Sequence, residues 1–395
     1  MSRILPWNWP APVPALEKNS SEVLYFDYAA TTPVDERVIA RMVECLGRGA
    51  TFGNPASTSH AFGHRAKEQV EKARQQVAEL VGAATDRIVW TSGATESNNL
   101  ALKGVACTQA GHAGHIVSSQ LEHKAVLDTL KQLEEQGFQV TYLEPDKNGA
   151  ITADAVLGAL REDSFLVSLM LVNNELGTVT DVASIGRLVR EHGALFHVDA
   201  AQATGKVDID LKTLEVDLMS FSAHKTYGPK GIGALYAGPR TEGKLRAQIH
   251  GGGHEQGLRS GTLATHQIVG MGEAFAIARE LAETERAHLS ALRERLLKAL
   301  AGLPITINGS RTTHVPNTLS LTPYYDFSIG NELALSSTSA CNSASNEPSH
   351  VLMALRLKPS EALRTIRLSL GRYSTEREVD RAAELIRSAL MIPIP

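Results

Sequence analysis

A lysine stands between a short apolar run and a glycine-rich turn. The run Leu218–Phe221 predicts a buried strand, and Ser222–Lys225 follows it directly, ahead of Gly228, Gly231 and Gly233. A lysine that is held rigidly and shielded from water at such a strand end has a lowered pKa and is a good nucleophile for imine formation. Taken alone, an ordinary surface lysine is the simpler interpretation of Lys225.

An aspartate occupies the corresponding place one predicted strand earlier. Asp199 directly follows the run Leu195–Val198, and Gln202 comes shortly after it. Ligands of open α/β sheets bind beyond the carboxyl ends of the strands, where a carboxylate can pair with the protonated ring nitrogen of a bound heterocycle. A carboxylate that caps the following helix is an equally good interpretation of Asp199 by itself.

A third segment combines small and hydroxyl-bearing residues. Thr91-Ser-Gly-Ala-Thr95 lies between the predicted strand Ile88–Trp90 and an apolar helical stretch. Such residues let backbone N–H groups and hydroxyls approach an anion at a helix N-terminus, which is what a phosphate site requires. The segment matches neither the Rossmann glycine pattern nor the P-loop, so dinucleotide and nucleoside triphosphate sites are disfavoured.

Strands and helices alternate regularly around these segments. Ala66–Val81 has apolar residues at helical spacing, with Gly82 placed to end the helix, and Thr375 and Glu378 are spaced as a capping box for a final helix. Apolar runs typical of strands occur at Ile88–Trp90, Ile116–Ser118, Val140–Leu143, Phe165–Val172, Leu195–Val198, Leu218–Phe221 and Ile232–Tyr236. This alternation predicts an α/β fold with a mostly parallel sheet between helices.

The pattern changes near Ile268, and the chain is longer than a single core usually supports. A long helical stretch begins there, with leucines at positions 289, 292, 296 and 300. We therefore expect a Pro/Trp-rich N-terminal arm over residues 1–24, a large domain over 25–267 and a smaller C-terminal domain over 268–395. The arm is interpreted either as a packed extended segment or as a disordered tail.

Composition excludes several classes of protein. The 395 residues are 43% hydrophobic and 21% charged, which is ordinary for a globular protein. The net charge of -4, without a basic run, argues against nucleic-acid and membrane-surface partners, and no run approaches the roughly 20 apolar residues of a membrane span. The N-terminus is a poor secretory signal. Cys45, Cys107 and Cys341 are widely separated, which argues against disulfides and a structural metal site and favours the cytoplasm.

The order of the motifs resembles the fold-type I pyridoxal phosphate enzymes. The matching segments are Tyr25–Pro33, Gly53–Pro55, Ser92–Asn99, Glu122–His123, Val172–Gly177, His197–Gln202, Ser222–Lys225, His250–Glu255, Arg259–Thr262, Ser336–Cys341 and Ile366–Arg372. The amino-acid sequences of these segments are similar to those of the class V aminotransferase-like group and, within it, of the cysteine desulfurases. The resemblance implies a large domain, a smaller α+β domain and conversion of L-cysteine to L-alanine, with the sulfur passed to an acceptor, as in iron–sulfur cluster biosynthesis.

The resemblance also implies a cofactor role for each matching residue. Lys225 would hold pyridoxal phosphate covalently, Asp199 would keep its pyridine nitrogen protonated and Gln202 would hydrogen-bond its phenolic oxygen. His123 would stack on the ring and shuttle protons, although for His123 by itself a satisfied core histidine is the better interpretation. The phosphate would be held by Thr95, Ser222 and His224, and by Thr262 of the other subunit of a homodimer.

The substrate roles fall on three residues from distant parts of the chain. Asn174 and Arg367 would bind the amino acid, with Arg367 as the bidentate partner of its carboxylate, whereas Arg372 is expected to be structural. Cys341 would be the nucleophile that takes the sulfur, because its small polar neighbours predict an exposed loop like that of the long-loop desulfurases. We expect Cys45 and Cys107, which lie in apolar helical patterns, to be buried and inert.

Some features depart from that subgroup and leave alternatives open. Thr338 and Asn342 replace its usual Gly and Thr, and the segment 322–335 is shorter, so the reach of the loop and the identity of the acceptor stay open. The chain ends soon after the final predicted helix, without the tail with which many relatives dock an iron–sulfur scaffold protein, so that partner is not assumed. The alternatives are a selenocysteine lyase, another class V enzyme or a catalytically silent, partner-binding subunit.

Overall fold

A seven-stranded sheet forms the centre of the protein. The computed structural model describes residues 23–49, 51–109, 114–337 and 347–391. The strands of this sheet are β2 (Ile88–Thr91), β3 (His115–Ser119), β4 (Gln139–Leu143), β5 (Ser164–Met170), β6 (Leu195–Asp199), β7 (Leu218–Ser222) and β8 (Gly233–Ala237). Their order is β2-β8-β7-β6-β5-β3-β4, and only β8 runs antiparallel to its neighbours. The seven predicted strands and the mostly parallel sheet are confirmed.

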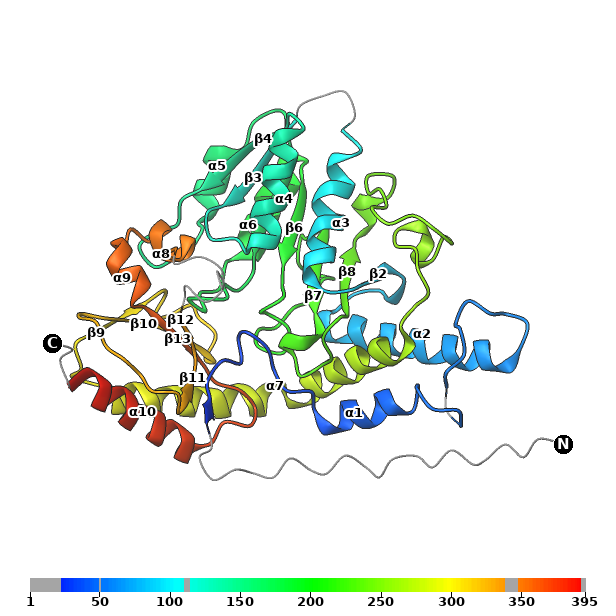
Figure 1. The fold of residues 1–395 in the computed structure, drawn as a ribbon. Helices are drawn as coiled ribbons and strands as arrows, with labels where there is room; N and C mark the ends of the chain where they lie inside the picture. Colours follow the sequence, from blue (N-terminus) through cyan, green and yellow to red (C-terminus); the bar gives the residue numbers. More distant parts are fainter. Residues whose placement is uncertain (1–22, 50, 110–113, 338–346, 392–395) are drawn as a thin grey trace.

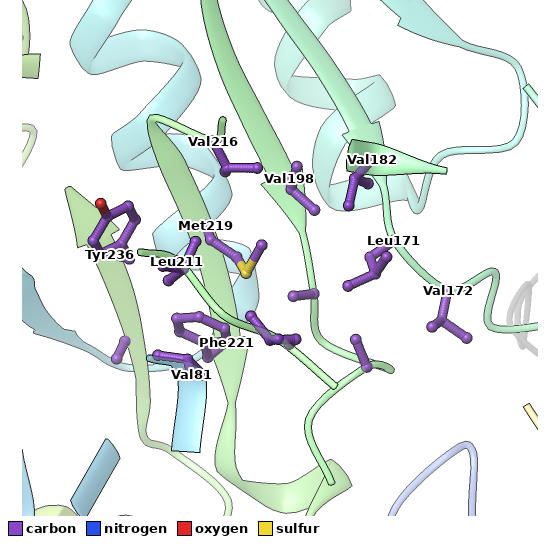
Figure 2. Close-up of a cluster of buried hydrophobic side chains, with 14 of the residues drawn as sticks. Val81, Leu171, Val172, Val182, Val198, Leu211, Val216, Met219, Phe221 and Tyr236 are labelled. Carbon is purple, nitrogen blue, oxygen red and sulfur yellow. The ribbon is translucent and has the colours of Figure 1, made fainter. Parts of the chain in front are cut away.

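Helices cover both faces of this sheet (Figure 1). The helices of this part are α1 (Glu36–Val43), α2 (Ala61–Val81), α3 (Ala94–Ala106), α4 (Lys124–Glu135), α5 (Ala153–Ala159) and α6 (Val182–His192), with short 3-10 turns η1 (Thr85–Arg87), η2 (Ala223–Lys225), η3 (Pro239–Thr241) and η4 (Glu255–Gly257). The side chains of successive strand residues pack into hydrophobic clusters on opposite faces of the sheet. Leu218 packs with α3 and α4, whereas Met219 packs with the helices of the opposite face. Figure 2 shows Met219 with Val198 and Phe221 in the cluster on that opposite face.

A long helix, α7 (Thr265–Ala299), joins this sheet to a second core. Its first half packs in the cluster of the large sheet through Phe275, and its second half packs with α10 through Leu296. The remaining elements are β9 (Ile305–Asn308), β10 (Thr318–Pro323), β11 (Leu333–Ala334), β12 (Ser336–Ser337), α8 (His350–Ala354), α9 (Pro359–Leu363), β13 (Ile366–Ser369) and α10 (Glu376–Met391). Strands β12-β13-β10-β9 form an antiparallel sheet. The division into domains at residue 268 stays a prediction.

The N-terminal segment of the described chain binds both parts of the molecule. Strand β1 (Leu24–Tyr25) pairs with β11, and Phe26 is buried in the second core. The carbonyl of Phe26 accepts from Ser369 N at 2.7 Å, while Thr32 N donates to the carbonyl of His224 at 3.0 Å. This segment therefore fixes the C-terminal sheet relative to the turn that follows β7. Most of the predicted arm, residues 1–22, lies outside the described residues.

Two sequence predictions about isolated residues have different outcomes. Cys45 is buried, but the prediction that Cys107 is buried is wrong: it is the residue at which α3 ends, and there its side chain is exposed. Arg372 is structural as expected, because it forms ion pairs with Asp35 and Glu285, each at 2.8 Å.

In the described parts of the chain, no helix is long and apolar enough to cross a bilayer.

The predicted capping box of the final helix is confirmed, and it supplies a test of the fold. Thr375 Oγ1 accepts from Glu378 N at 3.2 Å, and Glu378 Oε2 accepts from Thr375 N at 2.7 Å. Thr375→Ala removes the first of these bonds and should lower the free energy of unfolding by about 1 kcal/mol. Urea unfolding measures this change. Arg377→Ala, at an exposed position in the same turn, is the control, and an equal loss in both variants would contradict the assignment.

Candidate functional site

A cavity of about 520 Å³ lies beyond the carboxyl ends of β6 and β7. This volume is within the range of small-ligand sites. It is lined by nine of the predicted site residues: Thr95, His123, Asn174, Asp199, Gln202, Ser222, His224, Lys225 and Arg367. The fold thus brings together residues from both halves of the chain, and the cavity lies beyond the carboxyl ends of parallel strands, where open α/β sheets bind ligands.

Lys225 enters the cavity from the short turn after β7. Its Nζ donates to the carbonyl oxygens of Ala29 at 2.7 Å and of Ala30 at 2.6 Å. Gln202 Nε2 donates to the same Ala29 carbonyl at 2.8 Å. On the neighbouring strand β8, Gly233 allows the loop after β2 to approach closely, because a Cβ there would lie only 2.6 Å from the Cα of Gly93. The N-terminal segment therefore supplies acceptors for Lys225 that sequence reasoning did not identify.

Asp199 presents a carboxylate to the cavity at the end of β6. It is buried, its Oδ2 accepts from Asn98 Nδ2 at 2.7 Å, and its Oδ1 accepts from Ala201 N at 2.9 Å. These bonds fix the carboxylate without a cationic side chain, so its charge remains available to a cationic ring. Asn98 was missed by sequence reasoning, although its spacing of three residues from Thr95 on α3 places both on one helix face.

His123 begins α4 and projects into the same cavity. Its Nδ1 accepts from Ala125 N at 3.1 Å, so in the neutral ring the proton is on Nε2. Burial lowers the pKa of His123; the negative charge of Asp199 opposes this shift and the positive charge of Lys225 reinforces it. The imidazole is therefore neutral at neutral pH and can both stack on a ring and exchange a proton.

Hydroxyls and a helix N-terminus form the anion-binding end of the cavity. Helix α3 begins after Gly93, whose φ of 153° and ψ of 177° are accessible essentially only to glycine. Thr95 lies in its first turn, and Ser222 and His224 approach from the β7 turn. Burial lowers the pKa of His224 to about 4, with the charge of Lys225 acting in the same direction, so its ring is neutral. The end of the cavity thus offers N–H and O–H donors to an anion.

Arg367 contributes a cationic side chain to the wall of the cavity. Its Nη2 donates to Asp27 Oδ1 at 2.8 Å and to Ser336 Oγ at 2.9 Å, and its Nη1 donates to the carbonyl of Asn174 at 2.9 Å. Its Nε is buried and has no hydrogen-bond partner among the described residues. A buried donor of this kind is costly unless it binds an acceptor, and a substrate carboxylate is a suitable one.

Thr262 does not line this cavity, and it is exposed on the chain that carries it. Cys341 lies outside the described residues. The described residues on either side of it contact the site: Ser336 is bonded to Arg367, and Ser349 Oγ donates to the buried Glu175, next to Asn174, at 2.6 Å.

Comparisons with known proteins agree with this geometry. The aminotransferase class-V family model matches residues 24–382. The cysteine desulfurase IscS of Pseudomonas aeruginosa (strain LESB58) is 57% identical over 375 residues, which cover 93% of this chain and 92% of that protein. A solved NifS-like protein has a TM-score of 0.85 and 39% identity, covering 93% of this chain and 99% of its own. The structure of SspA in complex with cysteine has a TM-score of 0.80 and 40% identity, covering 89% and 99%.

The buried carboxyl of Glu122, beside His123, predicts a pH-dependent stability. Burial raises its pKa from 4.5 to about 8, although Ser119 Oγ and Met170 N donate to it. The folded protein keeps this proton where the unfolded chain has lost it, so this group makes the free energy of unfolding fall as the pH rises from about 4.5 to about 8. Glu122→Gln should reduce that fall by about 1 kcal/mol or more.

Urea unfolding across this pH range measures the effect. Glu135→Gln, at an exposed position of the helix α4 that follows Glu122, is the matched control and should follow the wild type. Parallel pH profiles for Glu122→Gln and the wild type would show that Glu122 does not keep its proton in the folded protein.

Proposed function

The chain belongs to the aminotransferase class-V family, and we propose that it acts within that family as a pyridoxal phosphate-dependent cysteine desulfurase in which Cys341 is the nucleophile that takes the sulfur from the substrate. The observation that carries the proposal is a single cavity with Lys225, Asp199 and Arg367 on its walls. It combines an amine, a carboxylate for a cationic ring and a cation for a substrate carboxylate. The IscS relative named above is a cysteine desulfurase, and the solved SspA structure is described as a complex with cysteine.

The residues present fit pyridoxal phosphate. Thr95, Ser222 and His224 offer donors for its phosphate, Asp199 is held by neutral donors and can pair with its ring nitrogen, and Lys225 can bind its carbonyl carbon. The bound cofactor supplies an electron-accepting ring that stabilises negative charge at the substrate Cα. Gln202 offers its amide to the phenolic oxygen, and His123 stacks on the ring.

The other residues around the cavity would bind the substrate and transfer protons. Arg367 and Asn174 hold the substrate carboxylate, which fixes the Cα–H bond relative to the ring. Lys225, which would hold the cofactor in the absence of substrate, would take the Cα proton on Nζ and return a proton to the product. His123, neutral at neutral pH, exchanges a proton with the substrate sulfur or nitrogen.

Cys341 completes the reaction. Its thiolate forms a bond to the substrate sulfur as the Cβ–S bond breaks, and the electron pair of that bond stays with the carbon fragment. The fragment takes up a proton and leaves as L-alanine, and Cys341 carries a persulfide that passes to an acceptor. The contacts of Ser336 and Ser349 support this role, because they hold the chain at the cavity on both sides of residue 341.

The proposal extends to assembly and location. Thr262 would bind the phosphate of a neighbouring subunit, which makes the enzyme a homodimer. Cys45 and Cys107 are free thiols, which supports a reducing cytoplasm as its location. A separate acceptor protein would take the sulfur from the persulfide on Cys341. Nucleic acids and membranes are not partners in this proposal.

Substitution of Cys341 tests the sulfur step. Cys341→Ser should retain the visible absorbance of the cofactor and still respond to L-cysteine, because proton removal at Cα does not need the thiol. It should lose at least about a hundredfold in sulfide release and form no protein persulfide. Persulfide labelling with peptide mapping, and alanine measured in parallel, provide the readout.

The other two cysteines are matched controls for that experiment. Cys45→Ser and Cys107→Ser should each keep near wild-type desulfuration, although Cys107 is exposed and Cys45 is not. Persulfide on Cys45 or Cys107, or unchanged activity of Cys341→Ser, would refute the assignment.

The shared phosphate site predicts that assembly and cofactor binding are coupled. Thr262→Ala should weaken pyridoxal phosphate binding by about tenfold, because it removes one hydrogen bond to a charged group. Sedimentation should show a dimer, and the affinity should be measured on the same samples by absorbance titration. A fully active monomer at assay concentration would exclude the shared site. Thr213→Ala, at another exposed threonine, is the control.

A further inference from the structure

Lys206 is a second lysine beside the cofactor cavity. Its Nζ donates to Gln202 Oε1 at 2.9 Å. Gln202 is buried and lines the cavity, and its Nε2 donates to the carbonyl of Ala29, which also accepts from Lys225. One chain of contacts therefore joins Lys206 to the cavity wall and to the lysine proposed to bind the cofactor.

These contacts allow only one orientation of the Gln202 amide. The carbonyl of Ala29 can only accept a hydrogen bond, and the Lys206 amino group is placed to donate one. Exchanging the amide oxygen and nitrogen would set two carbonyl oxygens against each other. Gln202 thus turns its NH₂ group, and not its oxygen, toward Ala29 and the cavity.

We propose that Lys206 is a positioning residue that acts on the cofactor through Gln202. It holds and polarises the amide oxygen, which strengthens the amide N–H groups as donors to an oxygen acceptor in the cavity. That acceptor is the phenolic oxygen of pyridoxal phosphate, so the inference rests on the proposed function and deepens it.

The surroundings of Lys206 determine how its charge depends on pH. The titratable and charged groups that face it are Tyr28, Lys225, Tyr227, Glu285, Arg367 and Arg372. Burial lowers the pKa of Lys206 to about 7, the charge of Lys225 lowers it further, and Glu285 opposes the shift. The amino group is a donor in both protonation states, whereas its positive charge is fully present only below about pH 7. The polarising effect is therefore largest on the acid side of neutrality.

Lys206→Met, prepared both with and without the cofactor, tests the inference. Pyridoxal phosphate should bind the cofactor-free variant about five- to tenfold more weakly than it binds the wild type. The visible absorbance of the loaded variant should titrate at a higher pH, because loss of a positive charge and of a strong donor both favour retention of the chromophore proton. Lys212→Met, at an exposed lysine in a nearby turn, should change neither quantity.

A double-mutant cycle with Gln202→Leu shows whether Lys206 acts through Gln202. In the Gln202→Leu background, Lys206→Met should change cofactor affinity by less than about twofold. Independent effects of the two substitutions, or a Lys206→Met protein with wild-type affinity and absorbance titration, would overturn the inference. If Lys206→Met does not fold, Lys206→Gln removes the charge and is judged by the same two outcomes. A wild-type protein that binds no pyridoxal phosphate would instead refute the proposed function itself.

Discussion

The site depends on the hydrogen bonds that join the amino group of Lys225 to the carbonyl oxygens of Ala29 and Ala30. These carbonyls belong to a segment whose Phe26 is buried in the C-terminal core and whose Ala29 N donates to Ser369 Oγ at 2.8 Å. The position of the lysine is therefore coupled to the strand β13, which carries Arg367. A shift of this segment would therefore move the amine of Lys225 relative to the guanidinium of Arg367. The large sheet and the C-terminal sheet must both be in place before the cavity has its final geometry.

The cavity wall carries both charged and neutral polar groups, and burial determines which of the titratable side chains are neutral. Asp199 is fixed by neutral donors, whereas burial, reinforced by the charge of Lys225, lowers the pKa values of His123 and His224. Both imidazoles are neutral as a result, so in the proposed function the phosphate would be bound through neutral donors and His123 would be free to exchange a proton. Arg367 keeps a buried Nε that has no partner among the described residues. In the proposed function, these groups would let one small cavity hold a dianionic cofactor and a zwitterionic amino acid in defined orientations.

The sequence predicts the strands and most of the cavity lining, because local patterns determine both. The run before Lys225 is a buried strand, and residues that follow parallel strands must meet at one edge of the sheet. Contacts between distant segments could not be predicted in this way. The carbonyls of Ala29 and Ala30 carry no side-chain chemistry, and the bond between Lys206 and Gln202 appears only when the turn after β6 is built. Cys107 has the apolar neighbours of a buried residue, yet it is exposed because α3 ends there.

Identification of the lysine that binds the cofactor tests the central claim most directly. Borohydride reduction of the cofactor-loaded protein, followed by proteolysis and mass spectrometry, fixes the cofactor to its lysine and locates it. Two other lysines are close enough to compete: Lys206, with its pKa lowered to about 7, and Lys230, which lines the cavity. The account predicts that the added mass is on the peptide containing Lys225 and that Lys225→Ala abolishes it. Mass on Lys206 or Lys230, in the wild-type protein, would contradict the account.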